Sequence, residues 1–440
     1  MLQPIFSGFF YFRCMREDLL HYIWKNGKIP IANLYTSRQK TLQIISLGIH
    51  NHDAGPDFFH AKLEINGQLW AGNVEIHVKS SDWYAHQHDM DSNYDNVILH
   101  VVWEEDTVVY RKNKQEIPTL ELRNFIPGYI LTNYYKLFNS SKDTFINCER
   151  ELDSIDKFKF SVWLERLYFE RLEEKSNEIN RLLAEAKNDW EKVLFILLLK
   201  NFGLKLNSEA FLSLGRTLEF GIVRRLSHNV FQLESVLFGL AGLLDNESSK
   251  DKVFTQMKKE YFYLRDKFRI KEGSVQKPSF FRLRPANFPT IRLSQLANLY
   301  ARQPQLFGNI IALKEVDQAY KIFSISTSKY WQKHYVFGKI SPKRENKLTK
   351  SFINLLLINT ILPMIFCYSK WQGRDVSSRI IMIVNKLKSE DNKIIRKFNN
   401  LGVNCSNAMC SQAILQLYNT YCTQNRCLEC VVGDSLLKGK

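Results

Sequence analysis

The spacing of apolar residues changes once along this chain of 440 residues, close to residue 150. Before that point apolar and polar residues alternate over short runs, which is the pattern of β-strands with one buried face. From residue 155 onward apolar residues recur three and four positions apart, as in amphipathic helices. The sequence therefore predicts an α+β fold, in which a mixed β-sheet domain precedes a mainly helical region.

These patterns predict five segments. Residues 1–14 form an N-terminal extension, 15–135 a β-rich domain, and 136–154 a linker. Residues 155–300 form a basic helical domain, and 301–440 a helical C-terminal region that holds a cysteine cluster. The strands are expected at 41–47, 58–65, 68–79, 97–103, 108–111 and 117–122, after an opening helix over 16–26.

Nothing in the sequence indicates export or a membrane. The longest apolar run, 193–199, is far shorter than the ~18 residues that a membrane-spanning helix needs. Residues 1–14 are apolar and aromatic, but they lack the basic start and small-residue cleavage site of a signal peptide. We therefore expect a cytoplasmic protein without a membrane partner.

The net charge of +16 is unevenly distributed. Residues 1–150 hold 15 Lys/Arg and 17 Asp/Glu, whereas the remainder holds 46 and 28. Clustered positive charge suits the phosphates of nucleic acid, although a solvated basic surface without a specific partner would look the same. The expected contact residues lie in the most basic stretch: Lys258, Lys259, Arg265, Arg282, Arg284 and Arg292.

Histidines are concentrated in the β-rich domain. Seven of the ten lie between residues 50 and 100, interleaved with aspartates and a glutamate. Imidazoles and carboxylates together are typical of divalent metal sites and of general acid–base catalysis. This density makes the β-rich domain the expected place of a functional site.

The strand over 73–79 puts chemically different groups on one face. Side chains alternate between the faces of a strand, so Glu75, His77 and Lys79 point the same way. An acid, an imidazole and an ammonium on one face predict a catalytic strand. The alternative is an amphipathic strand whose polar face is merely solvated.

A tight turn at Asn66-Gly67 is expected to join this strand to the preceding one. A two-residue turn pairs residue 65 with 68, which places Phe58 opposite Glu75 and His60 opposite Asn73. Asp57 would then pair with Ile76 and point to the other face. A bulge or twist at the start of the strand, after Gly55-Pro56, would be needed to turn Asp57 toward the site.

Three further histidines follow the strand. His86 and His88 form a His-x-His pair that could hold a metal together with Asp57, Glu75 and His77. His100 lies in an apolar strand, where a hydrogen-bonded core histidine and a ligand are equally expected.

The run over residues 52–102, HDAGPDFFHAKLEINGQLWAGNVEIHVKSSDWYAHQHDMDSNYDNVILHVV, resembles an uncharacterised bacterial family that is catalogued as a domain of unknown function. The resemblance extends over nearly the whole chain from Met15, including 163–175, 233–244, 282–297 and the cysteine-containing 411–433. It implies membership of the family but no activity.

The β-rich core also resembles restriction-endonuclease-like nucleases. In those enzymes a Pro-Asp begins one strand, and an acid and a lysine lie on the next. The resemblance implies that Asp57 and Glu75 hold a metal and that Lys79 positions or activates the attacking water. It also implies that Glu17 is an additional acid of the site. The superfamily spaces its acid and lysine two residues apart, whereas Glu75 and Lys79 are four apart. Either His77 replaces the acid as a ligand, or Glu75 reaches the metal from further along.

These features favour a nuclease or phosphodiesterase dependent on Mg²⁺ or Mn²⁺. A metal held by Asp57 and Glu75 or His77 would activate water, and Lys79 would stabilise the developing charge. One alternative is a non-catalytic nucleic-acid-binding or scaffold protein. The other is a metal-dependent hydrolase of a small substrate that uses His86 and His88.

Three cysteines near the C-terminus have metal-ligand spacing, Cys422-x4-Cys427-x2-Cys430. Structural metal sites usually have four ligands, and Cys148 and Cys410 are the candidates for the fourth. The family resemblance favours Cys148, and similarity to nucleases and glycosylases with such a cysteine arrangement favours an iron–sulfur cluster over zinc. Reduced, buried cysteines without a metal are the alternative.

Overall fold

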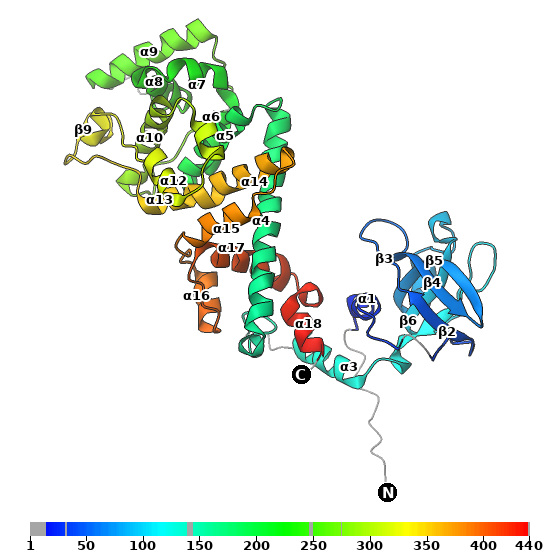
Figure 1. Ribbon diagram of the computed structural model, residues 1–440. Helices are drawn as coiled ribbons and strands as arrows, with labels where there is room; N and C mark the ends of the chain where they lie inside the picture. Colours follow the sequence, from blue (N-terminus) through cyan, green and yellow to red (C-terminus); the bar gives the residue numbers. More distant parts are fainter. Residues whose placement is uncertain (1–14, 31–32, 139–143, 246–249, 274, 439–440) are drawn as a thin grey trace. The chain divides into compact units, whose positions relative to one another are not determined.

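The computed structural model describes residues 15–30, 33–138, 144–245, 250–273 and 275–438 (Figure 1). The expected extension over 1–14 lies outside the described residues. The chain divides into two compact units. Unit 1 contains the residues up to Phe160 together with those from Thr420 onward, and unit 2 contains Ser161–Asn419. The C-terminal residues thus fold with the N-terminal domain, whereas the sequence had placed all of 301–440 in one region.

Unit 1 is built on a mixed sheet with the strand order β1-β2-β4-β5-β6-β7, in which β3 pairs with β4. Strands β1 to β5 are antiparallel, whereas β5, β6 and β7 are parallel. The expected mixed sheet is confirmed. The strands are β1 (Leu34–Tyr35), β2 (Thr41–Ser46), β3 (Ile49–His50), β4 (Phe58–Ile65), β5 (Gln68–Lys79), β6 (Val97–Glu104) and β7 (Thr119–Glu121).

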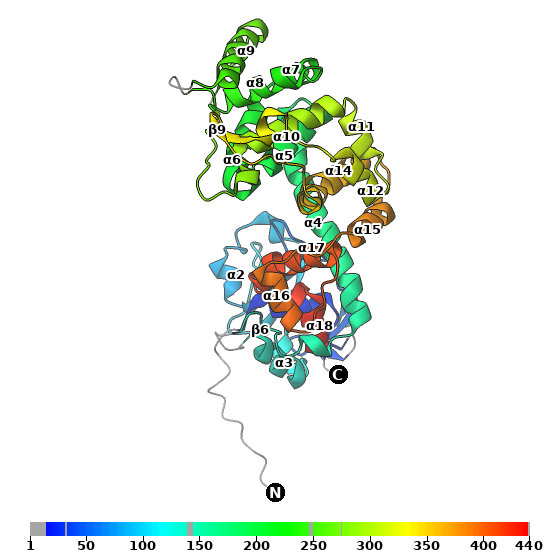
Figure 2. The same ribbon diagram turned by 90° about the vertical axis from the view of Figure 1, so that its left-hand side faces the viewer.

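Helices from both ends of the chain cover this sheet. Helix α1 (Glu17–Lys25) contacts β5, and its buried residues Leu19, Ile23 and Trp24 join the core of the sheet. Helix α18 (Val431–Lys438) packs on α3 (Gly128–Phe138), and Leu437 reaches the same core (Figures 1 and 2). Because the burial of apolar surface drives this packing, the last residues are part of the N-terminal domain.

The hairpin between β4 and β5 begins in the expected register. Ile65 pairs with Gln68, and the same register continues to Ala61 opposite Gly72. It then shifts, so that Phe58 faces Val74 and not the expected Glu75. A bulge at 59–60 causes the shift, and His60 adopts the left-handed conformation there with φ of 58°.

In the residues that the structure describes, unit 2 is mainly helical and contains a short hairpin of β8 (His334–Val336) and β9 (Lys339–Ile340). The long α4 (Lys157–Glu185) leads into it. The mainly helical region expected from the sequence is thereby confirmed. Its further α-helices are α5 (Trp190–Phe202), α6 (Leu204–Thr217), α7 (Phe220–Leu226), α8 (Val230–Leu240), α9 (Lys252–Phe268), α10 (Pro289–Arg302), α11 (Leu306–Ile311), α12 (Val316–Ile322), α13 (Lys350–Leu356), α14 (Leu362–Trp371), α15 (Ser377–Asn385), α16 (Lys393–Asn400) and α17 (Ala408–Gln416).

One continuous helix, Lys350–Trp371, is long and apolar enough to cross a membrane by length and composition. It joins α13 and α14 through the π-helical turn η6 (Leu357–Ile361). Asn354 and Asn359 divide its apolar residues into short runs, none of which reaches the length of a membrane span. Two thirds of its apolar window (67%) is buried inside the protein.

Candidate functional site

The polar face of β5 is buried. Glu75 is 4% exposed and His77 is 1% exposed, so this face is not a solvated strand surface. A carboxylate and an imidazole withdrawn from water need polar or charged partners. Their partners come from the loop before β4, from the turn after α2 (Asp82–Ala85) and from β6.

Asp57 is turned toward Glu75 by the loop over 51–56. The Asn51 side chain donates hydrogen bonds to the carbonyl oxygens of Asp53 and Pro56, which folds this loop over itself. The N–H of Asp57 then donates to Glu75 Oε2 at 3.1 Å, and Asp57 Oδ2 accepts from the N–H of Ile76 at 2.9 Å. The bulge between β4 and β5 therefore supplies the turn that Asp57 needs to face the site.

A tight turn brings His86 and His88 to the end of β5. Helix α2 ends at Ala85, and Gln87 adopts the left-handed conformation with φ of 61°. The N–H of His88 then donates to the carbonyl of Trp83 at 3.0 Å. Trp83 is fully buried, so the core holds this turn in place.

His77, His86 and His88 form the first ligand group. One nitrogen from each lies within 4.8 Å of the others. Glu75 Oε1 is 3.6 Å from His77 Nε2 and 3.3 Å from His88 Nε2, which adds a carboxylate oxygen to the group. His86 is exposed, so the group opens to solvent on one side. Three imidazoles and a carboxylate are a common ligand set for zinc, manganese and iron.

Glu17, His21 and Asp57 form the second ligand group. Their potential ligand atoms also lie within 4.8 Å of one another. His21 Nε2 is 3.3 Å from Glu17 Oε1 and 3.5 Å from Asp57 Oδ2. Since Asp57 is hydrogen-bonded to Glu75, the two groups adjoin, with Glu75 between them.

His100 orients His77. His100 Nε2 lies 2.8 Å from His77 Nδ1, which leaves His77 Nε2 directed at His86 and Glu75. Histidines that bind metals commonly engage their second nitrogen in this way. His100, in the apolar strand β6, is therefore a hydrogen-bonded core histidine that positions a neighbour.

The electrostatics of the site favour a cation. Burial and the nearby charge of Glu75 raise the pKa of Asp57 to about 7, because two carboxylates this close repel each other. Burial and the surrounding histidines lower the pKa of His77 far below its ordinary value, which keeps the ring neutral and able to bind a metal. Burial lowers the pKa of His21, but the hydrogen bond to Glu17 and the charge of Asp57 raise it overall.

The structure thus brings together Asp57, Glu75, His77, His86 and His88. Lys79 is exposed at the end of β5, and its backbone N–H donates to Asp82. Glu17 had been considered as an additional acid, whereas His21 was missed because it stands alone on an amphipathic helix. Only the packing of α1 against β5 reveals that His21 belongs to the site.

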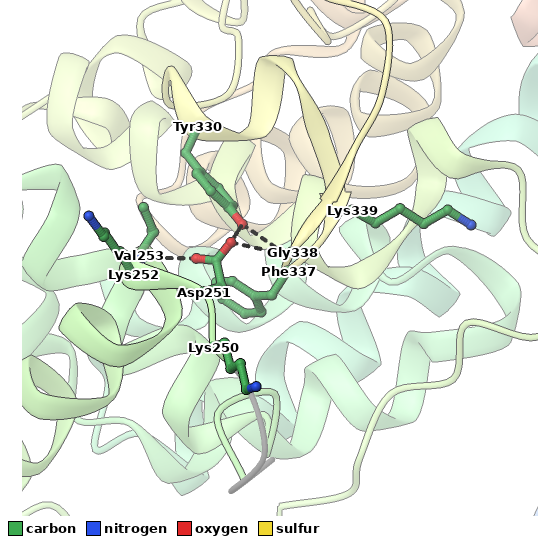
Figure 3. A pocket seen from close by; sticks show the side chains of 8 residues that line it. All are labelled: Lys250, Asp251, Lys252, Val253, Tyr330, Phe337, Gly338 and Lys339. Carbon is green, nitrogen blue, oxygen red and sulfur yellow. Dashed lines mark hydrogen bonds between the residues drawn. The ribbon is translucent and has the colours of Figure 1, made fainter.

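A separate hollow of about 740 Å³ lies in unit 2 (Figure 3). Asp251 at its centre accepts hydrogen bonds from the Tyr330 hydroxyl at 2.6 Å and from the Gly338 N–H at 3.0 Å. The side chains of Lys250, Lys252 and Lys339 point away from one another in Figure 3. The lysine side chains therefore do not converge in this hollow. Through its hydrogen bonds Asp251 links the β8–β9 hairpin to the start of α9.

All six basic residues expected to contact nucleic acid lie in or after α9. Lys259, Arg282 and Arg284 are exposed, while Lys258 and Arg265 are half-buried. Arg292 differs, because its side chain is 7% exposed and lies 3.8 Å from the centre of the Phe352 ring. Its guanidinium donates to Asn287 and Gln295, so it is not accessible to a phosphate.

The cysteine candidates separate between the two units. Cys148, Cys422, Cys427 and Cys430 all lie in unit 1. Cys410 lies in unit 2 and is joined to Cys405 by a disulfide. Of the two candidates for a fourth ligand, Cys148 is the one that lies in the same unit as the C-terminal three.

Comparison with known proteins adds one finding. The family described as a protein of unknown function, DUF2851, matches residues 17–393 and so covers both ligand groups and most of unit 2. No curated protein and no solved structure matches the chain. The match covers far more than half of the sequence, and the chain belongs to the DUF2851 family.

Proposed function

We propose that unit 1 is a metal-dependent hydrolase that cleaves phosphodiester bonds in nucleic acid. The observation that carries the proposal is the convergence of two ligand groups on Glu75, one of histidines and one of Glu17, His21 and Asp57. Two adjacent divalent ions could activate a water and stabilise the leaving oxygen of a phosphoryl group.

The ligand types favour a transition metal. Imidazole nitrogens suit manganese, zinc and iron, whereas Mg²⁺ prefers oxygen ligands and bound water. Of the two ions predicted from the sequence, Mn²⁺ therefore fits His77, His86 and His88 better than Mg²⁺ does. The oxygen-rich group of Glu17 and Asp57 suits either ion.

Nucleic acid as the substrate is supported by the surface of α9 and the residues that follow it. Phe262, Tyr263 and Phe281 are 40%, 55% and 71% exposed. Arg265 lies 4.7 Å from the centre of the Phe262 ring, and Arg282 lies 5.0 Å from that of Phe281. Exposed aromatic rings among cations are typical of surfaces on which bases stack while the cations contact phosphates.

The resemblance to restriction-endonuclease-like nucleases supports the hydrolysis of phosphodiester bonds. The metal ligands, however, differ from those of that superfamily. Asp57 and Glu75 occupy the positions of the two acids in that comparison. His77 adds an imidazole where the superfamily has a carboxylate. Lys79 as the residue that activates water stays a prediction, because its side chain is exposed whereas those of Glu75 and His77 are buried.

The test compares substitutions in the first ligand group with a histidine outside it. Glu75→Gln keeps the side-chain shape but removes the charge, and His86→Ala alters an exposed residue with little effect on folding. Both should lower Mn²⁺-dependent cleavage of labelled DNA or RNA at least a hundredfold, since losing one preorganised group of a catalytic site costs about 3 kcal/mol of barrier. His60→Asn, at the exposed bulge, is the matched control and should cleave like the wild type.

Three outcomes would overturn the proposal. The first is wild-type cleavage by both Glu75→Gln and His86→Ala. The second is metal-dependent turnover of small phosphoesters without any cleavage of nucleic acid, which would identify a hydrolase of small substrates. The third is binding of nucleic acid without turnover in any metal, which would identify the scaffold alternative.

A further inference from the structure

The last segment of the chain gathers three cysteines into one loop. Cys422 ends the π-helical turn η7 (Leu417–Cys422), and η8 (Cys427–Glu429) begins five residues later. The N–H of Arg426 donates to the carbonyl of Tyr421 at 2.9 Å, and that of Cys430 donates to the carbonyl of Cys427 at 3.2 Å. These bonds fold the loop back on itself, and among the described residues the sulfur atoms of these cysteines do not form a group that lies within 4.8 Å of one another.

Side-chain contacts of Asn147 link the segment around residue 148 to this loop. The Asn147 side-chain amide donates to Asn425 Oδ1 at 3.1 Å and approaches Cys427 Sγ at 3.5 Å. Asn147 therefore places the adjoining Cys148 beside a loop that is about 280 residues further along the chain. Cys148, Cys422 and Cys427 are half-buried, and Cys430 is 7% exposed.

The four cysteines lie near one another in unit 1. The charges of Cys430 and Cys427 act on Cys148, and those of Cys148, Cys430 and Cys427 act on Cys422.

Packing of α18 against the loop and against the rest of unit 1 adds to the support of the cysteines. A Cβ atom on Gly433 would lie 1.9 Å from the carbonyl oxygen of Cys427, so only glycine fits where α18 passes the loop. The Tyr22 hydroxyl donates to Asp434 at 2.8 Å, and Leu437 lies in the core of the sheet. The cysteines are thus presented by a scaffold that the rest of unit 1 supports.

We propose that Cys148, Cys422, Cys427 and Cys430 bind one thiophilic metal centre, a zinc ion or an iron–sulfur cluster, which fastens the C-terminal segment to the N-terminal domain. Four cysteine thiolates are a complete ligand set for either centre. The proposal is independent of the proposed hydrolase activity, because none of these residues belongs to the two ligand groups around Glu75.

The experiment uses the full chain purified without oxygen. Zinc, iron and acid-labile sulfide are measured, and about one thiolate-bound centre per chain is expected. Iron with labile sulfide identifies a cluster, and zinc without sulfide identifies a zinc site. Cys148→Ser and Cys427→Ser should each lose this centre, whereas Cys367→Ser, which alters a buried cysteine of unit 2, should keep it.

A second measurement distinguishes this centre from the histidine site. It uses the wild-type protein, so it does not depend on whether the variants fold. Co²⁺ is titrated into reduced wild-type protein that has been stripped with a chelator. Only thiolate ligands give an intense sulfur-to-cobalt charge-transfer band, and removing the metal should make the chain susceptible to proteolysis near residue 420. The proposal is overturned if no such band forms and the anaerobic protein holds neither thiolate-bound zinc nor iron with sulfide, or if Cys148→Ser retains the full centre.

Discussion

At the scale of single residues, the buried carboxyl group of Glu234 shows how environment sets a protonation state. Glu234 lies on α8 and is 3% exposed. Its Oε1 accepts hydrogen bonds from the hydroxyls of Ser294 and Ser328 at 2.5 and 2.6 Å. Burial nevertheless raises the pKa of Glu234 to about 7, because two neutral hydroxyls compensate only part of the lost hydration.

This raised pKa gives unit 2 a defined pH dependence. The folded protein binds a proton at Glu234 that the unfolded chain has lost above a pH of about 4.5. The contribution of Glu234 to folding stability is therefore highest at low pH. It falls as the pH rises toward 7 and is constant above pH 7. A shift of this size corresponds to a loss on the order of 3 kcal/mol.

Glu234→Gln should remove that dependence, since glutamine keeps the acceptor oxygen and carries no charge. Chemical denaturation at pH 5.5 and pH 8 measures it. We expect the variant to exceed the wild type in stability at both pH values, and by clearly more at pH 8, because at pH 5.5 the wild type has lost only part of the stability that the protonated Glu234 contributes. An equal difference in stability at both pH values would show that Glu234 does not titrate in this range.

At the scale of secondary-structure elements, the bulge between β4 and β5 determines what the site contains. Without it the hairpin register would turn Asp57 away from Glu75. Gly48 supports the bulge, because its own φ is 88° and a Cβ atom there would lie 2.6 Å from the carbonyl oxygen of Phe59. A side chain at position 48 would therefore displace the bulged strand.

Gly48→Ala should destabilise unit 1 by about 1–3 kcal/mol and weaken metal binding at the Asp57 group. Gly67→Ala is the matched control, since Gly67 also has a positive φ of 79° but has no atom within 4 Å of the added Cβ. Denaturation and Mn²⁺ calorimetry compare the two variants. If both bound Mn²⁺ with wild-type affinity, the bulge would not be what positions Asp57.

At the scale of the whole molecule, charge is separated along the chain. The metal-ligand groups lie in a stretch with slightly more acidic than basic residues, and the positive excess lies beyond residue 150. Helix α9 lies beside α8 in both views and carries part of this excess together with exposed aromatic rings (Figures 1 and 2). Because binding of a polyanion releases counterions, a surface of this kind should bind in a strongly salt-dependent way.

Replacing four exposed cations of this surface by alanine should weaken DNA or RNA binding and lower the slope of log K against log[salt] by about one per residue. These cations are Lys259, Lys267, Arg282 and Arg284. Fluorescence anisotropy at several salt concentrations measures both effects. The control replaces four exposed lysines elsewhere in unit 2, Lys314, Lys321, Lys386 and Lys393. A common slope for the two quadruple variants would mean that general charge, and not this surface, governs binding.

The sequence alone determined the features that depend on neighbours in the chain. The change of apolar spacing gave the mixed sheet and the helical region. The Asn66-Gly67 turn fixed the register as far as Ala61, and strand alternation aligned Glu75 with His77. Turn geometry and side-chain alternation are set by a few adjacent residues, which is why they can be read directly.

Only the tertiary structure decided which distant residues complete each site. The bulge that aims Asp57 depends on the contact between Gly48 and Phe59, which no local pattern records. His21 reaches Asp57 because α1 packs on the sheet, and the C-terminal segment joins unit 1 because α18 buries Leu437 in the core of that unit. Such contacts follow from the burial of apolar surface between segments far apart in sequence. The hydrophobic effect is non-directional, so the sequence alone does not show which of these segments will meet.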